Sequence, residues 1–345
     1  MPVKYGIIGV GAIAQRRHIP ECIANPDSVL LGIADANQAR CDELGTKFGV
    51  KSFCDHKDLL KMGEIDAVVV SGPNALHASQ TIDALNAGKH VLCEKPMAIS
   101  RDEAKAMIAA AEKNKKYLMI GLNQRLMPPH VRAKEILKTG RLGNVLSFRT
   151  AFKHPGPEGW SVDAAKSWFF RKDQAFMGVT GDLGIHKADL MRWLLDQEFT
   201  EVGGLITTLD KRDGEGNLIA LDDNAYLTLK TSGGVIGSMI LSWTNYGQEE
   251  NYTVLYCQKG VLSLGTDSTY GVIVDYKNGD REQHKVGAMS TNTKQVASGV
   301  IDSFTKSILE KKAPEIDGME GLKSLDVILT AQEAAREGKT KKIGA

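Results

Sequence analysis

The feature that most constrains the fold is a glycine-rich turn near the N-terminus. Residues 4–8 form an apolar run typical of a buried strand, and residues 9–14 follow with the pattern G-x-G-x-x-A. In such a turn Gly9 permits a tight bend, Gly11 lets a pyrophosphate approach the backbone, and Ala14 lets the next helix pack closely on the strand. That helix would offer unpaired N–H groups to phosphates. We therefore expect a dinucleotide-binding domain with cofactor contacts from Gly9, Gly11, Ala12, Ile13 and Ala14.

The next strand-like run ends on an acidic residue. Residues 29–34 are apolar and Asp35 follows them. In a dinucleotide fold an acid at this point accepts hydrogen bonds from the adenosine ribose hydroxyls. Ala36 and Asn37 come next instead of Arg or Lys, so we expect no neighbouring cation to neutralise a 2'-phosphate. NAD is favoured and NADP is the alternative; for Asp35 itself the alternative is a helix N-cap.

Strand-like and helix-like segments alternate through the first third of the chain. Further apolar runs occupy residues 65–70, 90–93 and 117–121. This alternation predicts a parallel, doubly wound sheet with helices on both faces, of the Rossmann type. The first of these runs breaks at residues 71–74. We expect Pro73, Asn74 and, one turn into the next helix, His77 to lie at the cofactor.

The triplet Glu94-Lys95-Pro96 closes the run at residues 90–93. Ligands bind at the carboxyl end of strands in an open parallel sheet, which places Lys95 where chemistry would occur and Glu94 and Lys95 beside the cofactor. Such a triplet alone is also compatible with a solvated turn. The motif gains meaning only from the segments on either side of it.

The length of the chain predicts two domains. At 345 residues it exceeds the size at which one hydrophobic core usually keeps growing. The last expected strand of the first set exits through Asn123, a further expected cofactor contact, and prolines at 128 and 129 then interrupt the chain. We expect a dinucleotide-binding domain at residues 1–123 and a substrate-binding and oligomerisation domain at residues 124–345.

The second half is rich in strand-like segments. Residues 145–152 alternate between faces as a half-buried strand does, and turn signals at 232–234 and 277–280 favour antiparallel hairpins. Two helix-like segments, residues 294–310 and 319–335, would cover one face of that sheet. The pattern predicts an α+β domain.

A cluster of polar residues marks the helix that begins near Asp182. Asp182, His186 and Asp189 are spaced i, i+4 and i+7, so they share one stripe of the helix. An N-cap aspartate and a core histidine are the alternatives. The preceding loop is aromatic, and Trp168 is its best candidate for a place at the site, although a packed loop base is the alternative.

Composition excludes several classes of function. The formal net charge is +1, which gives no cationic face for nucleic acid, so a small ligand is the expected partner. The five cysteines form no C-x-x-C or zinc-like cluster, and we expect no metal and a reducing compartment. The sequence has neither a signal-peptide pattern nor an apolar run of membrane-spanning length, so we expect a cytoplasmic protein without membrane partners.

In this order, the motifs resemble those of the Gfo/Idh/MocA family of NAD(P)-dependent oxidoreductases. They are Gly9-x-Gly11-x-x-Ala14, Asp35, Pro73-Asn74-x-x-His77, Glu94-Lys95-Pro96, Asn123-Gln124-Arg125-Leu126-x-Pro128 and Gly181-Asp182-x-Gly184-x-His186-x-x-Asp189. The resemblance implies a Rossmann domain followed by an α+β domain on an open, mostly antiparallel sheet. Residues 176–181 and Phe169 depart from the family pattern, which often has a glycine run and an Arg there.

The resemblance also implies a site and a reaction. Sugars, cyclic polyols or their derivatives would be oxidised at a secondary hydroxyl, with hydride passing to nicotinamide. The implied catalytic residues are Lys95, Asp182 and His186, and the expected substrate contacts add Arg125 and Trp168. We expect His186 to act as base, Asp182 to orient its ring and Lys95 to bind the oxygen.

Two other functions fit the same motifs. Some relatives hydrolyse glycosides by transient oxidation with retained NAD, and the fold also serves ligand-sensing regulators. Loss of the lysine and histidine would suit a regulator, and both are present here. The family habit favours a homodimer or homotetramer through the C-terminal sheet.

Overall fold

The computed structural model describes residues 1–287 and 297–344. Its first sheet has six strands in the order β3-β2-β1-β4-β5-β6, and every pairing is parallel. The strands are β1 (Val3–Ile8), β2 (Ser28–Ala34), β3 (Lys51–Phe53), β4 (Ala67–Val70), β5 (His90–Cys93) and β6 (Leu118–Ile120). The central strands are buried apolar runs, as a sheet covered on both faces requires. The expected doubly wound Rossmann sheet is confirmed.

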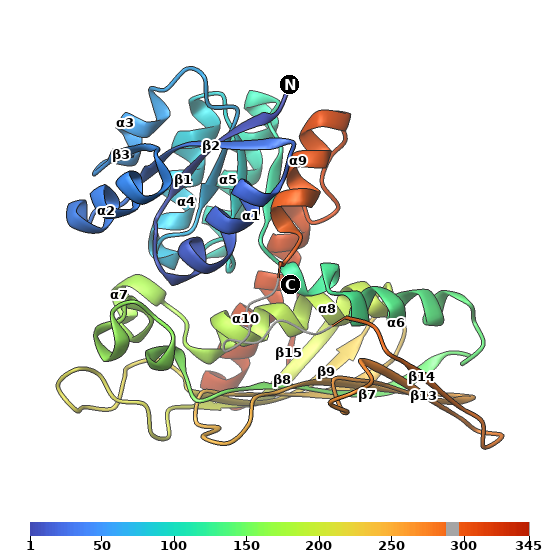
Figure 1. Ribbon diagram of the computed structural model, residues 1–345. Coiled ribbons are helices and arrows are strands. Elements are labelled where there is room, and N and C mark those ends of the chain that lie inside the picture. Colours follow the sequence, from blue (N-terminus) through green and yellow to red (C-terminus); the bar gives the residue numbers. More distant parts are fainter. Residues whose placement is uncertain (288–296, 345) are drawn as a thin grey trace.

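Helices connect these strands, and three of them begin at ordinary capping residues. The side chains of Asn37, Asp55 and Ser100 accept the backbone N–H that opens α2, α3 and α5. The connecting elements are the π-helical turn η1 (Ala14–His18), α1 (Ile19–Ala24), α2 (Gln38–Phe48), α3 (His56–Leu60), α4 (Asn74–Asn86) and α5 (Arg101–Asn114). They bring the ends of β1, β2, β4 and β5 to one edge of the sheet (Figure 1).

The second sheet has nine strands in the order β14-β13-β12-β11-β7-β10-β9-β8-β15. They are β7 (Val145–Lys153), β8 (Phe199–Thr207), β9 (Asn224–Thr231), β10 (Ile236–Ser242), β11 (Glu250–Cys257), β12 (Gly260–Leu264), β13 (Val272–Tyr276), β14 (Arg281–His284) and β15 (Lys341–Lys342). Its pairings are antiparallel except that β7 and β10 run parallel. The expected α+β half on a mostly antiparallel sheet is confirmed.

Three helices lie on one face of this second sheet (Figure 1). They are α6 (Pro128–Lys138), α8 (Ile185–Leu195) and α10 (Gly318–Glu337). Of the two helices that we expected to cover this sheet, only the second does so. The first is α9 (Val300–Glu310), which packs against α1 and β1 of the other sheet, where the Tyr5 hydroxyl bonds the Thr305 hydroxyl at 2.8 Å. The expected start of that helix at residues 294–296 lies outside the described residues.

The chain crosses between the two sheets more than once. After β6 it enters the 3-10 turn η2 (Asn123–Leu126) and then α6, as expected for a crossing point. It returns near its end, where the backbone N–H of Ile120 donates to Ile316 at 2.9 Å. The division at residue 123 stays a prediction, because α9 rejoins the first sheet. In the described part of the chain, no helix is long and apolar enough to cross a membrane.

Candidate active site

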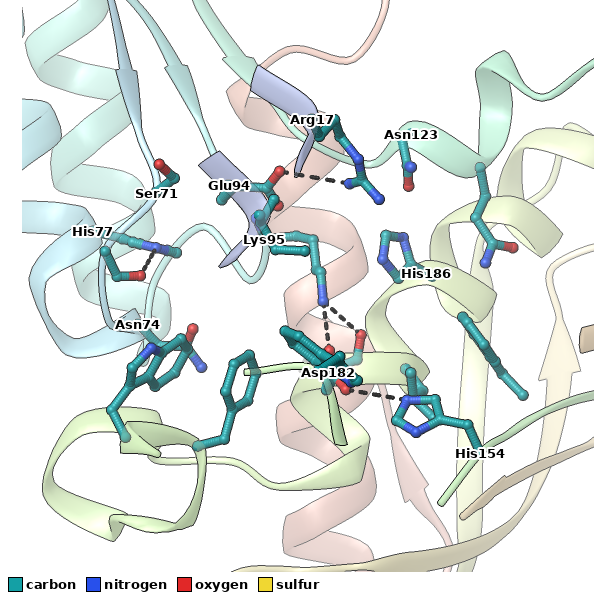
Figure 2. A pocket seen from close by; sticks show the side chains of 18 of the residues that line it. Arg17, Ser71, Asn74, His77, Glu94, Lys95, Asn123, His154, Asp182 and His186 are labelled. Carbon is teal, nitrogen blue, oxygen red and sulfur yellow. Dashed lines mark hydrogen bonds and ion pairs between the residues drawn. The ribbon is translucent and has the colours of Figure 1, made fainter. Parts of the chain in front are cut away.

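A cavity lies between the carboxyl ends of the first sheet's strands and the helices on the second sheet (Figure 2). Lys95 reaches it from the end of β5. Asp182 reaches it from the π-helical turn before α8, and His186 reaches it from the first turn of α8. The structure therefore brings together the three residues expected to be catalytic. The polar lining residues are Arg17, Ser71, Asn74, His77, Glu94, Lys95, Asn123, Gln124, His154, Asp182 and His186.

Lys95 is held directly by Asp182. Its ammonium donates to Asp182 Oδ1 at 2.7 Å and to the Asp182 backbone carbonyl at 2.9 Å. The lysine side chain is 14% exposed and that of the aspartate 7%. The peptide between Lys95 and Pro96 is cis. A largely buried ion pair thus joins the two sheets at the floor of the cavity.

The carboxylate of Asp182 is held in its charged form. Burial alone would raise its pKa, but the Lys95 ammonium and the neighbouring His154 lower the pKa well below the usual range. Its second oxygen, Oδ2, accepts a hydrogen bond from the indole Nε1 of Trp243 at 3.1 Å. Every one of these partners favours the ionised carboxylate.

His186 lies one turn beyond Asp182, where the π-helical turn η6 (Thr180–Gly184) passes into α8. Burial and then the Lys95 charge hold the pKa of its ring well below the ordinary value, so the imidazole is neutral at physiological pH. Within the described residues, Nδ1 has no hydrogen-bond partner. No hydrogen bond joins Asp182 to His186, which corrects our expectation that Asp182 orients this ring.

Glu94 fixes the backbone at Lys95. Its carboxylate accepts hydrogen bonds from His18 Nε2 at 2.8 Å and from the Lys95 backbone N–H at 3.1 Å, and Arg17 lies 3.9 Å away. A side chain at Gly121 would press against this carboxylate at 3.1 Å. Burial opposes ionisation, yet His18, Arg17 and Lys95 hold the pKa of Glu94 well below its usual range.

His77 anchors one loop to another. Its ring lies between the carbonyl oxygens of Pro96, 2.8 Å from Nδ1, and Gly72, 3.0 Å from Nε2. The Asn74 amide donates across the cavity to the Ala175 carbonyl at 2.8 Å. Both side chains thus fix the walls of the site. Asn74, His77, Glu94 and Asn123, all expected cofactor contacts, line the Lys95 cavity rather than its larger neighbour.

The larger neighbouring cavity fits a dinucleotide. Gly9, Gly11, Ala12, Ile13, Asp35 and Pro73 line it. Gly9 has a positive φ of 83°, and a Cβ there would clash with the Gly72 backbone at 2.6 Å, whereas a Cβ at Gly11 would meet nothing within 4 Å. Gly11 therefore leaves open space against the turn, as a pyrophosphate requires. Ala14 is buried beneath the turn, where its small side chain permits close packing.

Asp35 lies at the adenosine end of this cavity. Its carboxylate accepts the backbone N–H of Val10 at 2.8 Å and of Asn37 at 2.9 Å. The expectation that no cation lies beside it was wrong, because Arg40 is 3.9 Å away. Arg40 is five residues further along the sequence, and the first turn of α2 brings it back to the end of β2.

The aromatic loop forms the wall shared by both cavities. Trp160, Trp168 and Phe169 line each of them, with Trp168 stacked on Phe169 at 3.9 Å between ring centroids. Trp168 thus lies where we expected it. In the described residues, no group of His, Cys, Asp and Glu could hold a metal ion.

Two family profiles match the chain. The one described as an oxidoreductase family with an NAD-binding Rossmann fold matches residues 3–122, and the one described as the GFO/IDH/MocA C-terminal domain matches residues 130–263. Together they cover more than half of the chain. The chain belongs to the Gfo/Idh/MocA family.

Several Gfo/Idh/MocA relatives are named dehydrogenases. A levoglucosan dehydrogenase of Pseudarthrobacter phenanthrenivorans is 31% identical over 64% of this chain, but only 60% of that relative's length is matched. A glucose-6-phosphate 3-dehydrogenase of Bacillus subtilis is 31% identical over 73% of this chain and 71% of that protein. The crystal structure of an aldose-aldose oxidoreductase from Caulobacter crescentus, complexed with glycerol, has a TM-score of 0.84 and 26% identity, covering 99% of this chain and all of that one.

One expected substrate residue of the Gfo/Idh/MocA pattern is not in the cavity. Arg125 is buried, and its guanidinium bonds both carboxylate oxygens of Asp189, at 2.8 and 2.6 Å, and the carboxylate of Glu320 at 2.5 Å. It lines neither the Lys95 cavity nor the dinucleotide cavity. Arg125 therefore fastens η2 to α8 and α10, and we no longer assign it to the substrate.

Sequence reasoning missed four residues of this site. Arg17, Gln124 and His154 line the Lys95 cavity, and Trp243 bonds Asp182 from beneath. Gln124 is part of the motif that begins at Asn123, so its position was the available signal. His154 and Trp243 belong to no motif, because only the pairing of two distant strands places them here.

Proposed function

We propose that this protein is an NAD-dependent dehydrogenase that transfers a hydride between a secondary hydroxyl carbon of a sugar or cyclic polyol and the nicotinamide ring. The convergence of Lys95, Asp182 and neutral His186 beside a dinucleotide cavity carries this proposal. Relatives named for the oxidation of levoglucosan and glucose 6-phosphate support the substrate class. The names of these relatives do not favour the two alternatives, a glycosidase that retains NAD and a ligand-sensing regulator.

His186, Lys95 and Asp182 have different roles in the proposed reaction. NAD held in the neighbouring cavity would supply the acceptor for the hydride. The hydroxyl proton must leave as well, and a neutral imidazole such as His186 can take it. Lys95 donates a hydrogen bond to the same oxygen and stabilises negative charge that develops on it. Asp182 holds Lys95 in place through the 2.7 Å ion pair.

Assembly and location belong to the same proposal. The face of the second sheet opposite α6, α8 and α10 exposes Leu205, Tyr226 and Ile236, which are 74%, 54% and 58% exposed. We propose that this face joins copies into a homodimer or homotetramer, which light scattering would test.

All five cysteines are free, which supports a cytoplasmic location.

A substrate panel tests the activity. D-glucose, levoglucosan, glucose 6-phosphate and myo-inositol would each be incubated with NAD and with NADP while absorbance of the reduced cofactor is followed. We expect turnover of at least one compound. Lys95→Met should lower kcat by about 1,000-fold, since it removes the donor at the reacting oxygen. Lys61→Met is the matched control, because the Lys61 side chain, just after the end of α3, is 76% exposed. No turnover by the unchanged protein, or full turnover by Lys95→Met, would contradict the proposal.

A further inference from the structure

Asp163 is a carboxylate of the dinucleotide cavity that the mechanism above does not use. It lies in the aromatic loop after β7, directly before the 3-10 turn η4 (Ala164–Lys166). It meets Arg40 of α2 beside Asp35, which follows β2. A loop from the second half of the chain thus supplies part of the site that we expect to bind adenosine.

The Arg40 guanidinium lies between two carboxylates. Its Nη2 donates to Asp163 Oδ1 at 3.1 Å, and its Nη1 lies 3.9 Å from Asp35 Oδ1. Asp163 is therefore the nearer of the two partners. The Arg40 side chain is 22% exposed, so dissolved salt screens these contacts less than it would on an open surface. Two carboxylates and one guanidinium leave this group of side chains with a net negative charge.

Asp35 is fixed in position to accept the hydroxyls of a ribose. Its Oδ2 accepts the Val10 N–H at 2.8 Å, and its Oδ1 accepts the Asn37 N–H at 2.9 Å. Each oxygen keeps a lone pair for a ribose hydroxyl. A phosphate on the 2'-hydroxyl would instead bring about two negative charges to this carboxylate. Such a ligand would be repelled unless a cation bound it.

Arg40 has the chemistry to bind a 2'-phosphate. A guanidinium binds phosphate through two parallel N–H groups, and an arginine near the acidic residue is a general means of accommodating the 2'-phosphate of NADP. In this structure Asp163 already accepts one of the N–H groups of Arg40. A 2'-phosphate would therefore have to displace a carboxylate of the protein itself.

We infer that Asp163 makes the cavity selective for a cofactor with a free 2'-hydroxyl, because it occupies the guanidinium that a 2'-phosphate would otherwise bind. Asp163 acts through Arg40 and is a positioning residue. The inference rests on the dinucleotide binding in the proposed function and is independent of the substrate. The choice of NAD over NADP is then made partly by a loop outside the Rossmann sheet and its helices.

Binding to the full chain tests the inference without any turnover. The fluorescence of bound NADH would be followed while ADP-ribose or 2'-phospho-ADP-ribose displaces it, and the ratio of their two dissociation constants measures the selectivity. We expect the unchanged protein to prefer ADP-ribose by about 100-fold or more. Asp163→Asn keeps the size of the side chain and removes its charge, so it should reduce this preference by about 10-fold.

Two further variants show whether the effect passes through Arg40. The double variant Arg40→Met with Asp163→Asn should show the full preference for ADP-ribose again, because the guanidinium that would bind the phosphate is gone. Glu282→Gln is the matched control. It removes the charge from another ion pair between distant segments, Arg141 with Glu282 at 2.7 Å, and neither residue lines the two cavities. Its selectivity should equal that of the unchanged protein.

Three results would overturn the inference. The unchanged protein would bind both ligands alike if Lys166 or Arg171, which also line the cavity, held the phosphate. Asp163→Asn would keep the full preference if its charge had no effect. The double variant would keep the reduced preference of Asp163→Asn if loss of a negative charge acted without Arg40. If the unchanged protein binds no NADH at all, the proposed function itself fails, which is a result distinct from these three.

Discussion

Glu94 shows at the residue scale how one buried carboxylate organises the site. It holds His18, lies beside Arg17 and receives the backbone N–H of Lys95, so it fixes the turn that carries the reacting ammonium. A buried charge with several partners is costly to disturb, because the partners lose their counter-charge. Glu94 therefore acts through Lys95 rather than on substrate.

Replacing Glu94 by Gln should destabilise the protein in a pH-dependent way. The folded-state pKa is lowered, so the stabilisation is present above the unfolded value of about 4.3 and is lost as pH falls through the folded-state value. We expect Glu94→Gln to lower the free energy of unfolding by ~3–5 kcal/mol at pH 7. The difference should shrink below about pH 4. Thermal unfolding at both pH values checks this, with exposed Glu43→Gln as control. An equal difference at both pH values would contradict it.

The residues that sequence could identify are those within local motifs. Lys95, Asp182 and His186 each follow a recognisable pattern, and the structure brings them to one cavity. His154 and Trp243 could not be identified, since each depends on which strands pair. Arg125 was misplaced for a related reason. The motif identifies Arg125, but it does not show that the Arg125 guanidinium binds the carboxylate of Glu320 on a distant helix.

At the scale of elements, the single parallel strand pair in the second sheet explains why His154 and Trp243 both lie beside Asp182. Strands β7 and β10 run in the same direction, so their carboxyl ends meet at one edge. His154 follows β7 and Trp243 follows β10, and both reach Asp182. Hairpin signals in the sequence predict antiparallel neighbours well, but they contain no information on a pairing between strands far apart in the chain.

Three elements are fastened by the buried ion cluster around Arg125. It joins η2, α8 and α10 through Asp189 and Glu320. Removing Arg125 leaves the buried carboxylate of Asp189 with only a more distant cation, Arg192 at 3.9 Å, so Arg125→Met should lower the free energy of unfolding by ~3–5 kcal/mol. Because Arg125 does not line the cavity, the KM of the folded enzyme should stay unchanged.

Urea unfolding and steady-state kinetics together check the Arg125 prediction. A double variant, Arg125→Met with Asp189→Leu, should recover part of the stability, because it also removes the buried carboxylate that has lost Arg125. A large rise in KM with unchanged stability would instead restore Arg125 to the substrate site.

At the scale of the whole molecule, the chain's two halves are less separate than its sequence implies. The alternating strands and the turn signals predicted both sheet types correctly. The route of α9 was not predictable, because an amphipathic helix fits either sheet and only the complementary surface at β1 decides between them. The close association of the halves also buries many titratable groups, including several histidines.

Two histidines, the partly buried His90 and the fully buried His130, predict acid sensitivity of the whole fold. Burial lowers the pKa of His90 to about 4 and that of His130 to about 3. Below the unfolded value of about 6.5, the unfolded chain binds protons that the folded protein does not, so stability falls as pH decreases from there. Each histidine contributes a slope of ~1.4 kcal/mol per pH unit.

Urea unfolding between pH 7 and 5 measures that slope. His130→Asn keeps a donor for the Gln124 carbonyl, which Nδ1 of His130 contacts at 2.7 Å, and it removes the titration. The variant should show a shallower decline, by about 1 kcal/mol per pH unit averaged over this range, because the unfolded histidine is only partly protonated near pH 7. Identical slopes in both proteins would show that His130 does not contribute.

The most direct test of the central claim is to follow the hydride itself. The best substrate of the panel would be supplied with deuterium on its ring carbons, and the reduced cofactor would be examined by mass spectrometry. We expect one deuterium per NADH, and labelled NADH formed about 1,000-fold more slowly by Lys95→Met. Substrate consumption that yields unlabelled NADH, or none, would contradict hydride transfer at the site of Lys95 and His186.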